Sequence, residues 1–275
     1  MSANAQQAQR VALITGTSRG IGSAVAQLFA QNGWLVIGVD CQPATNDAAR
    51  LNVHEFHRVD LADPSAIETL RNEVAAKHAH LNALVSVAGV QSREMAKADL
   101  ANTTLDDYHR IMDINLRAPW LLSKHFASLL AAAAGSKPTE YSAIVMCSSI
   151  QAQTTVPNMT VYAASKGGLN AMTRALACEL ASERIRACAV MPSAIDTPLL
   201  RIAFETDVRI NPATGQPMSV AEQAAACVQK QPMARLGECS EVAEAIHFLA
   251  DSRKSSFITG ECMAVDGGCL SRLPF

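Results

Sequence analysis

The sequence has little that would point to nucleic acid or a membrane. Its net charge is −2 and it contains no dense run of Lys and Arg, so it lacks the basic patch that would bind the phosphate backbone of a nucleic acid. No stretch approaches the ~18 apolar residues of a membrane span, and the initial MSANAQQAQR has no apolar leader core. These absences predict a soluble, cytoplasmic protein without a nucleic-acid or membrane partner.

Cysteine and histidine are present but are not clustered. The eight cysteines form no C-x-x-C pair, and the seven histidines form no H-E-x-x-H set. At 275 residues the chain is also too long to need disulfide bridges for a stable core. We therefore expect reduced, mostly buried thiols and no metal site.

The composition supplies material for a large core, with 49% hydrophobic and 17% charged residues, a balance that excludes disorder. Short β-branched runs alternate with longer Ala/Leu-rich runs, which predicts βαβ units and a parallel sheet covered on both faces. The predicted strands are 10–15, 34–40, 54–60, 82–89, 142–149, 185–191 and 262–268. The predicted helices are 20–33, one that begins at Pro64 after an Asp63 cap, 104–131, 160–182 and 240–250.

The segment 198–231 breaks this alternation. Asn211-Pro212 and Gly215-Gln216-Pro217 interrupt it, although apolar residues such as Leu199 and Leu200 flank the interruptions. We expect a loop-rich insertion on the strand-end side of a single domain that covers 1–275. A mobile cover over the substrate and a rigid pair of helices both agree with this pattern.

A glycine-rich turn, TGTSRGIG at 15–22, joins the first predicted strand to the first helix. Gly16, Gly20 and Gly22 lie where unpaired N–H groups and a positive helix dipole suit a pyrophosphate. The glycines are four and two residues apart, so the turn is a variant of the G-x-G-x-x-G type. An ordinary glycine-rich turn is the alternative.

Two residues give opposed signals about the cofactor. Asp40, at the end of strand 34–40, would bind the adenosine ribose hydroxyls and repel a 2′-phosphate, whereas Arg19 could attract that phosphate or simply be solvated. We favour NAD because a close carboxylate blocks the phosphate while an exposed arginine only permits it. Asp60 is expected near the adenine, with a ligand-free carboxylate at a helix start as the alternative.

Three side chains have the chemistry for proton exchange with an alcohol. Tyr162 and Lys166 in YAASK are four apart and share a helix face. A phenol has a pKa of about 10, and a nearby ammonium together with an oxidised nicotinamide would lower it. Ser149 closes strand 142–149 at the edge where α/β ligand sites form. From these residues alone, a solvated Tyr-Lys pair and a serine turn cap stay open.

In order and in spacing, TGTSRGIG, MDINLRAPW, IVMCSSI, YAASKGGLNAMTRALACEL and ITGECMAVDGG resemble the short-chain dehydrogenase/reductase family over about 10–270. The resemblance implies a Rossmann-like, doubly wound parallel sheet of about seven strands in a three-layer α/β/α fold. It also implies NAD(P) binding and a homotetramer, with a homodimer as the alternative.

The resemblance further implies a catalytic tetrad. Tyr162 would be the acid/base, Ser149 would hydrogen-bond the substrate oxygen, and Lys166 would bind ribose and depress the tyrosine pKa. Asn115 would hold a water that joins Lys166 to a proton relay. The expected cofactor contacts are Gly16, Ser18, Arg19, Gly20, Ile21, Gly22, Asp40, Asp60, Leu61, Ala88, Gly89, Tyr162, Lys166, Pro192, Ile195 and Thr197.

Two departures from the family pattern bear on this site. Ser86-Val87 stands where an Asn usually braces the sheet centre, which predicts a weaker brace. Ser193 stands where Gly is usual, and a left-handed backbone there would cost about 1 kcal/mol. The contacts expected from Ile195 and Thr197 would then shift. A helix cap is the alternative role for Thr197.

The sequence therefore predicts an NAD-dependent oxidoreductase that interconverts a secondary alcohol and a ketone. The alternatives are an NADP-dependent carbonyl reductase of the same family and a cofactor-binding regulatory protein without turnover. Sugar-nucleotide epimerases and dehydratases share Y-x-x-x-K but are usually longer. The substrate stays open, because the side chains of 198–231 suit a polyol, a cyclic alcohol or a keto acid alike.

Overall fold

The computed structural model describes residues 9–42, 53–94, 98–135, 139–206, 210–211 and 214–271. Its centre is a seven-stranded sheet in the order β3-β2-β1-β4-β5-β6-β7, in which each neighbouring pair is parallel. The strands are β1 Val11–Thr15, β2 Leu35–Asp40, β3 Glu55–Arg58, β4 Ala83–Ser86, β5 Ser142–Cys147, β6 Ile185–Pro192 and β7 Cys262–Val265. The predicted doubly wound parallel sheet is confirmed.

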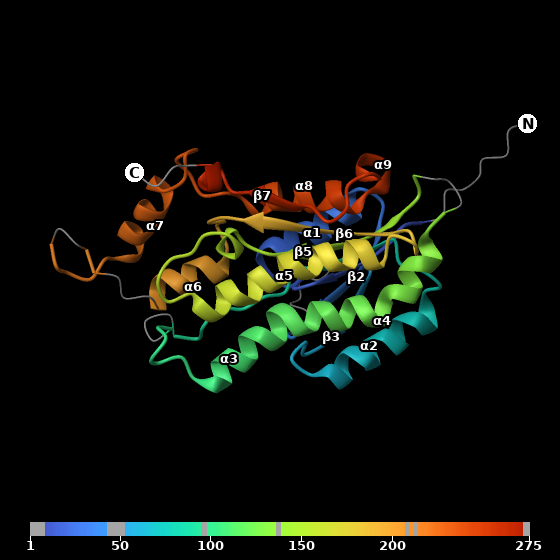
Figure 1. Ribbon diagram of the computed structural model, residues 1–275, viewed down its shortest axis with the longest axis horizontal. Coiled ribbons are helices and arrows are strands. Elements are labelled where there is room, and N and C mark those ends of the chain that lie inside the picture. Colours follow the sequence, from blue (N-terminus) through green and yellow to red (C-terminus); the bar gives the residue numbers. More distant parts are fainter. Residues whose placement is uncertain are drawn as a thin grey trace, which may run out of the picture.

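Helices cover both faces of this sheet (Figure 1). They are α1 Gly20–Gln31, α2 Pro64–Lys77, α3 Leu105–Met112, α4 Ala118–Ala133, α5 Thr160–Glu179, α6 Pro198–Thr206, α7 Val220–Gln229, α8 Cys239–Ala250 and α9 Ser252–Ser255. One buried cluster packs α2, α4 and α5 against the sheet, and a second packs α1 and α8 against the other face. None of the helices in the described part of the chain is long and apolar enough to span a bilayer.

The strand order creates a crevice at one edge of the sheet. From β1 the chain winds outward to β2 and β3, and it then crosses to β4 on the other side of β1. The loops that leave β1 and β4 therefore diverge at their carboxyl ends, where open α/β sheets bind their ligands. Every predicted site residue that follows a strand is carried to this edge.

The predicted strands 82–89 and 142–149 are too long at this edge. β4 ends at Ser86 because the next two amides, of Val87 and Ala88, leave the ladder and donate to the hydroxyl of Thr15, each at 3.1 Å. β5 ends at Cys147 in the same way, as Ser149 turns to cap the short helix η3, Ile150–Ala152. Shortened strands expose these loops to the crevice.

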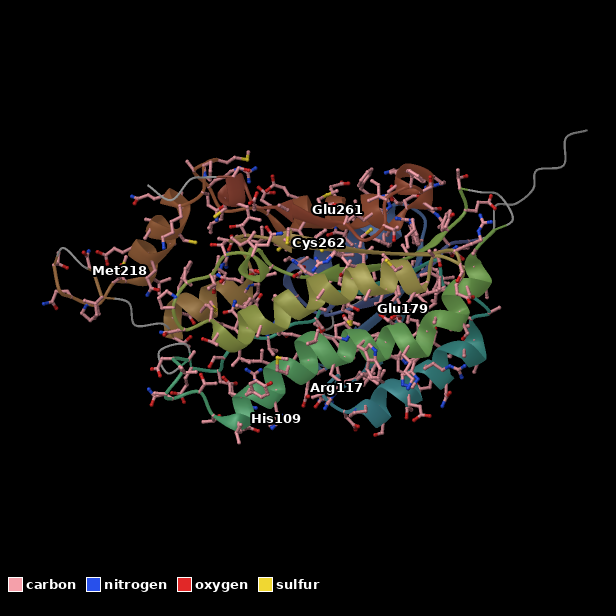
Figure 2. The ribbon with its side chains drawn as sticks, viewed as in Figure 1. His109, Arg117, Glu179, Met218, Glu261 and Cys262 are labelled. Atoms are coloured by element: carbon pink, nitrogen blue, oxygen red, sulfur yellow. The ribbon has the colours of Figure 1, made fainter. Side chains whose placement is uncertain are left out.

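The helix predicted over 104–131 is present without a break, but its middle is a π-helical turn. This turn, η2 Asp113–Arg117, lies between α3 and α4. Arg117, labelled in Figure 2, pairs with Asp113 at 2.8 Å and donates to the main-chain oxygen of Ala62 at 2.7 Å. These contacts tie the widened turn to the loop after β3.

The segment 198–231 contains two helices, α6 and α7, of which the second begins at a capping box formed by Ser219 and Glu222. Figure 2 places Met218, just before α7, at the outer end of the molecule, far from Glu261 and Cys262 at the start of β7. Positions 207–209 and 212–213 of the predicted insertion lie outside the described residues. The described part of this segment therefore contains a pair of helices.

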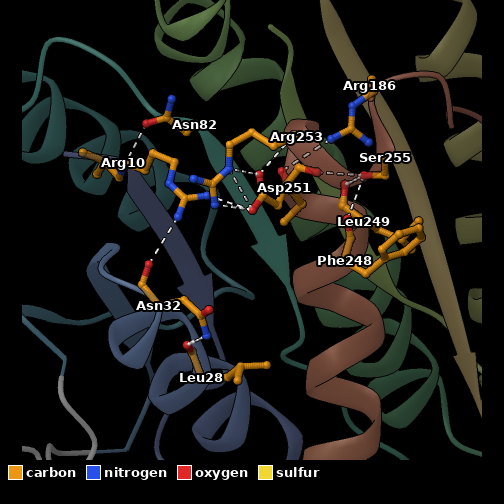
Figure 3. A network of polar contacts seen from close by, with 12 residues as sticks. Arg10, Leu28, Asn32, Asn82, Arg186, Phe248, Leu249, Asp251, Arg253 and Ser255 are labelled. Atoms are coloured by element: carbon orange, nitrogen blue, oxygen red, sulfur yellow. Dashed lines mark hydrogen bonds and ion pairs between the residues drawn. The ribbon is translucent and has the colours of Figure 1, made fainter. Parts of the chain in front are cut away.

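A charged network fastens the opposite edge of the sheet (Figure 3). Asp251 lies 3.0 Å from Arg10 and 2.6 Å from Arg253, and the buried Arg186 of β6 donates to two main-chain carbonyls beside it. Burial alone would raise the pKa of Asp251, but hydrogen bonds from Arg253 and the charge of Arg10 lower it to about 2. The network holds the amino ends of the strands, away from the crevice.

Candidate active site

A cavity of about 520 Å³ occupies the crevice. Its wall comprises the glycine turn, the loops after β2 to β6, the first turns of α5, and side chains of α6 and α7. This wall joins segments that are widely separated in the sequence.

Two glycines allow the turn after β1 to close tightly. Gly16 has φ +77°, and a Cβ there would lie 2.9 Å from the main-chain nitrogen of Ala88. A Cβ on Gly22 would collide with the Gly16 carbonyl oxygen. The first turn of α1, with Gly20 and Ile21, thus meets the cavity directly, where helix-start N–H groups suit an anionic ligand.

The carboxylate of Asp40 is fixed in place at one end of the cavity. Its Oδ2 accepts from the Ser18 N–H at 3.0 Å, and its Oδ1 accepts from the Gln42 N–H at 2.9 Å. Ser18 itself is not part of the cavity wall, because its N–H faces Asp40 and its hydroxyl is buried. The hydrogen bond from Ser18 therefore fixes the Asp40 carboxylate to the glycine turn.

Asp60, Leu61 and Arg19 complete this end of the wall. Asp60 is exposed, and its Oδ1 accepts from the Ala62 N–H at 2.9 Å. Arg19 is exposed too, and its guanidinium pairs with no carboxylate of the residues described. Asp40 and Arg19, which gave opposed signals about the cofactor, thus both line this end of the cavity.

Tyr162 and Ser149 meet at the other end. Tyr162 lies in the first turn of α5, and its hydroxyl interacts with the side chains of Ser149 and Gln91. Ser149 also accepts from the Gln151 N–H at 3.2 Å, so it caps η3 while it faces the tyrosine. The turn-cap role of this serine is therefore present, and its hydroxyl also lies beside the tyrosine.

Burial sets the acidity of this phenol. It raises the pKa of Tyr162 well above its ordinary value of 10, the neighbouring Cys147 raises it further, and the hydrogen bonds with Ser149 and Gln91 lower it in part. In the chain alone, burial outweighs the contributions that lower this pKa. That Lys166 depresses the pKa of Tyr162 in the enzyme with its cofactor stays a prediction.

Lys166 is directed at a main-chain oxygen. Its Nζ donates to the carbonyl of Cys147 at 2.8 Å and lies 5.6 Å from the centre of the Tyr162 ring. The side chain is almost completely buried, which lowers the pKa of Lys166, while Cys147 acts in the opposite direction. A buried ammonium with one protein acceptor has N–H groups left for a ligand.

Asn115 lies behind the cavity, in the π-helical turn. Its Oδ1 accepts from the Val90 N–H at 2.8 Å, and its Nδ2 donates to the Val90 carbonyl at 2.9 Å and to the Ser165 hydroxyl at 3.2 Å. A Cβ on Gly89 would lie 3.4 Å from both Asn115 Oδ1 and Lys166 Nζ. The amide therefore fastens the loop after β4 to α5, close to the lysine.

The hydroxyl of Thr15 holds the loop after β4 at Ser86-Val87, where the sequence departs from the family pattern. The hydroxyl of Ser86 is buried without a partner among the described residues, whereas Thr15 accepts from Val87 and Ala88. The loop is thus held from β1. Thr15 is the first residue of the TGTSRGIG motif, but nothing in the sequence pointed to the role of its hydroxyl.

Ser193, the second departure from the family pattern, does not adopt the left-handed backbone that would strain a serine. Among the described non-glycine residues, only Asn158, Arg184 and Ala234 have positive φ, so Ser193 adopts an ordinary backbone. Its hydroxyl instead accepts from Gln231 Nε2 at 2.8 Å and donates to Gln231 Oε1 at 3.2 Å. No pattern in the sequence pointed to Gln231 or to Gln91.

The loop after β6 brings the last predicted residues to the wall. Pro192 ends β6, and Ile195 forms a parallel bridge with Gly237. Thr197 Oγ1 accepts from the Leu200 N–H at 3.2 Å at the start of α6, so its helix-cap role is present. The cavity wall includes Ala88, Gly89, Pro192, Ile195 and Thr197.

Comparison with known proteins agrees with this geometry. A family model described as Enoyl-(Acyl carrier protein) reductase matches residues 16–269. The chain is 35% identical over 266 residues to cis-4-hydroxycyclohexanecarboxylate dehydrogenase of Sinomonas cyclohexanicum, covering 95% of this chain and 96% of that protein. The chain belongs to the short-chain dehydrogenase/reductase family. It is therefore an oxidoreductase of the kind that acts on alcohol and ketone groups.

Solved structures of short-chain dehydrogenases share the fold along nearly the whole chain. The ligand-free aldohexose dehydrogenase of Thermoplasma acidophilum has a TM-score of 0.84 at 29% identity, over 97% of this chain and 96% of that one. The 3-ketoacyl-(acyl-carrier-protein) reductase of Brucella melitensis in complex with NADH has 0.78 at 27%, over 94% and 98%. ElxO with NADP bound has 0.81 at 25%, over 96% and 100%. The related structures thus include one with each cofactor.

Proposed function

We propose that the protein is an NAD-dependent oxidoreductase that interconverts a secondary alcohol and a ketone, with Tyr162 as the acid/base. The observation that carries the proposal is the meeting of Tyr162, Ser149 and Lys166 on one cavity that also receives the first turn of α1. Helix-start amides suit a dinucleotide pyrophosphate, and the hydroxyl pair suits a substrate oxygen.

The chain's own residues fit a nicotinamide dinucleotide. The Gly16 turn admits no Cβ, as a close phosphate approach requires, and Asp40 presents a fixed carboxylate to a ribose. Asp60, Leu61 and Ala88 would surround the adenosine, and the glycine turn would hold the pyrophosphate. Pro192, Ile195 and Thr197 would face the nicotinamide, and Lys166 its ribose. When bound, the cofactor supplies the hydride acceptor or donor.

The proton is handled by the protein. In alcohol oxidation, the Tyr162 oxygen takes the hydroxyl proton while Ser149 donates a hydrogen bond to the substrate oxygen. Because burial raises the pKa of Tyr162, its protonated form is favoured at neutral pH, which suits proton donation to a ketone. The buried Lys166 ammonium is positive charge near the ring that would stabilise a phenolate. Asn115 would keep the loop after β4 aligned with Lys166 and would hold the water of the proton relay.

Arg19 supports a second candidate, an NADP-dependent carbonyl reductase. Its guanidinium reaches the cavity beside Asp40 without an ion pair to a described residue, so it is free to meet a 2′-phosphate. A cofactor-binding regulatory protein without turnover is the non-enzymatic alternative. The decisive assay follows reduced-cofactor absorbance with NAD and with NADP over a panel of secondary alcohols, including polyols, cyclic alcohols and 4-hydroxycyclohexanecarboxylate. Turnover with NAD supports the proposal, and binding without turnover on the whole panel contradicts it.

We also propose a homotetramer. Leu105 and Tyr108 of α3 and Trp120 of α4 are large apolar side chains with exposed fractions of 76%, 41% and 47%. Exposed apolar surface of this kind is what subunit packing covers. Light scattering should give about four chains per particle, and Trp120→Glu should reduce that number. A monomer in the unmodified protein would contradict the proposal.

A further inference from the structure

Charge is distributed unevenly over the cavity wall. The charged residues of the wall are Arg19, Asp40, Asp60, Lys166 and Lys230. The first three cluster at the glycine turn and the ends of β2 and β3, and Lys166 is bound to the Cys147 carbonyl. The rest of the wall, away from the glycine turn, is where the substrate would lie. Among the described residues of α6, α7 and the neighbouring loops, Lys230 is the one that brings a charged side chain to this part of the wall.

Nothing on the described chain neutralises Lys230. Its side chain is exposed at the cavity, and it forms no ion pair or side-chain hydrogen bond with any described residue. The wall of the same cavity also includes apolar side chains, among them Val156, Met159, Leu199 and Phe204. The carboxylates of the wall, Asp40 and Asp60, lie at the ends of β2 and β3, so an unpaired ammonium elsewhere on a partly apolar wall suits a ligand with an apolar body and a negative end.

The backbone beside Lys230 is held in place. Its N–H donates to the Cys227 carbonyl at 3.2 Å as α7 ends. The next residue, Gln231, is buried and makes the two side-chain hydrogen bonds with Ser193 described above. We call this pair the Ser193–Gln231 clasp. Because Ser193 lies directly after β6, the clasp fixes the end of α7 to the sheet edge that carries the site.

We propose that Lys230 binds a carboxylate on the alcohol or ketone substrate, and that the Ser193–Gln231 clasp positions it. The inference rests on the proposed function, since it concerns the molecule placed against Tyr162. A lone ammonium matches one negative charge, whereas a phosphate dianion is usually met by several donors. α7 presents its carboxyl end here, which offers no N–H groups to any anion, so Lys230 would be the single charged donor to the ligand.

Affinity for an unreactive pair of ligands tests this directly. Cyclohexanecarboxylate and cyclohexanecarboxamide have nearly the same shape and differ by one charge. Binding to the NADH-loaded enzyme, followed by cofactor fluorescence, should favour the carboxylate by about twofold to fivefold, as for an exposed ion pair. Lys230→Met should abolish that preference and Lys230→Arg should keep most of it. Lys254→Met, which removes an exposed charge outside the cavity wall, is the matched control and should change nothing.

The clasp has its own readout. Ser193→Gly restores the residue usual in the family and removes both hydrogen bonds to Gln231. We expect KM for 4-hydroxycyclohexanecarboxylate to rise about threefold to fivefold with kcat unchanged, and KM for the matching carboxamide to stay the same. An equal effect on both substrates, or a loss confined to kcat, would overturn the positioning role.

The outcomes separate this inference from the proposed function. No carboxylate preference in the unmodified enzyme, or a preference that survives Lys230→Met, overturns the inference even if neutral alcohols are oxidised. A preference that depends on Lys230 without turnover of any alcohol upholds the binding site and contradicts the oxidoreductase assignment of that site. Inorganic phosphate that competes more strongly than the carboxylate would show a phosphate site and overturn the choice of ligand.

Discussion

Replacement of Asp40 by Asn should change the cofactor preference. The carboxylate accepts N–H bonds from Ser18 and Gln42, at 3.0 and 2.9 Å, so it cannot turn away from a 2′-phosphate without losing both. Each such bond to a charged group is worth about 1.5–3 kcal/mol. Repulsion between unit charges about 4 Å apart is about 1–4 kcal/mol between bulk water and a protein surface. We therefore expect the Asp40 carboxylate to keep both hydrogen bonds and its position, although it repels a bound 2′-phosphate.

We take about 2 kcal/mol as the resulting penalty for NADP, which is roughly a 30-fold preference for NAD. Asp40→Asn keeps the shape and one acceptor oxygen but removes the charge. The preference should fall to within about threefold, since the remaining difference is only the fit of the amide.

The assay is titration of NADH and NADPH by fluorescence, which needs no substrate. Asp60→Asn is the matched control, because Asp60 also lines the cavity and loses the same charge but is expected at the adenine edge. Equal affinity for the two cofactors in the unmodified protein would refute the reasoning. An unchanged ratio in Asp40→Asn, or an equal change in Asp60→Asn, would do the same.

Three further predictions concern stability and pH. Gly22→Ala forces a Cβ against the Gly16 carbonyl, so the free energy of unfolding in urea should fall by about 1–3 kcal/mol. The pKa of Asp251, lowered from 3.8 to about 2, means that its ionised form stabilises the fold above pH 3.8. That contribution, about 2 kcal/mol, is lost as the pH falls towards 2 and should be absent from the acid unfolding of Asp251→Asn. Ser149→Ala removes a bond that lowers the pKa of Tyr162, so the rise of kcat/KM for alcohol oxidation with pH should move to higher pH and kcat should fall roughly 100-fold.

Much of the fold could be predicted because its signals are local. A buried parallel strand is a short apolar run, and Asp63 before Pro64 is a helix start; Asp63 indeed accepts from the Ser65 N–H at 2.8 Å. The glycine turn is also local, since Gly22 must pack against Gly16 a few residues away. Such features depend on neighbours in the sequence, and pattern reasoning reaches them.

The remainder depends on contacts between distant residues. The π-helical turn at Asn115 accompanies contacts with Val90 and Ser165, 25 and 50 residues away. The Ser193–Gln231 clasp spans 38 residues. The backbone of Ser193 and the burial of Tyr162 also depend on distant contacts, because neither strain nor burial can be read from a substituted motif or from i,i+4 spacing.

The most direct test of the central claim is turnover by Tyr162→Phe with cofactor binding measured beside it. The substitution removes only the hydroxyl that faces Ser149 and Gln91. The account predicts that kcat on any active alcohol falls by about 100-fold or more while affinity for NADH stays within about twofold. Full turnover by Tyr162→Phe would contradict it.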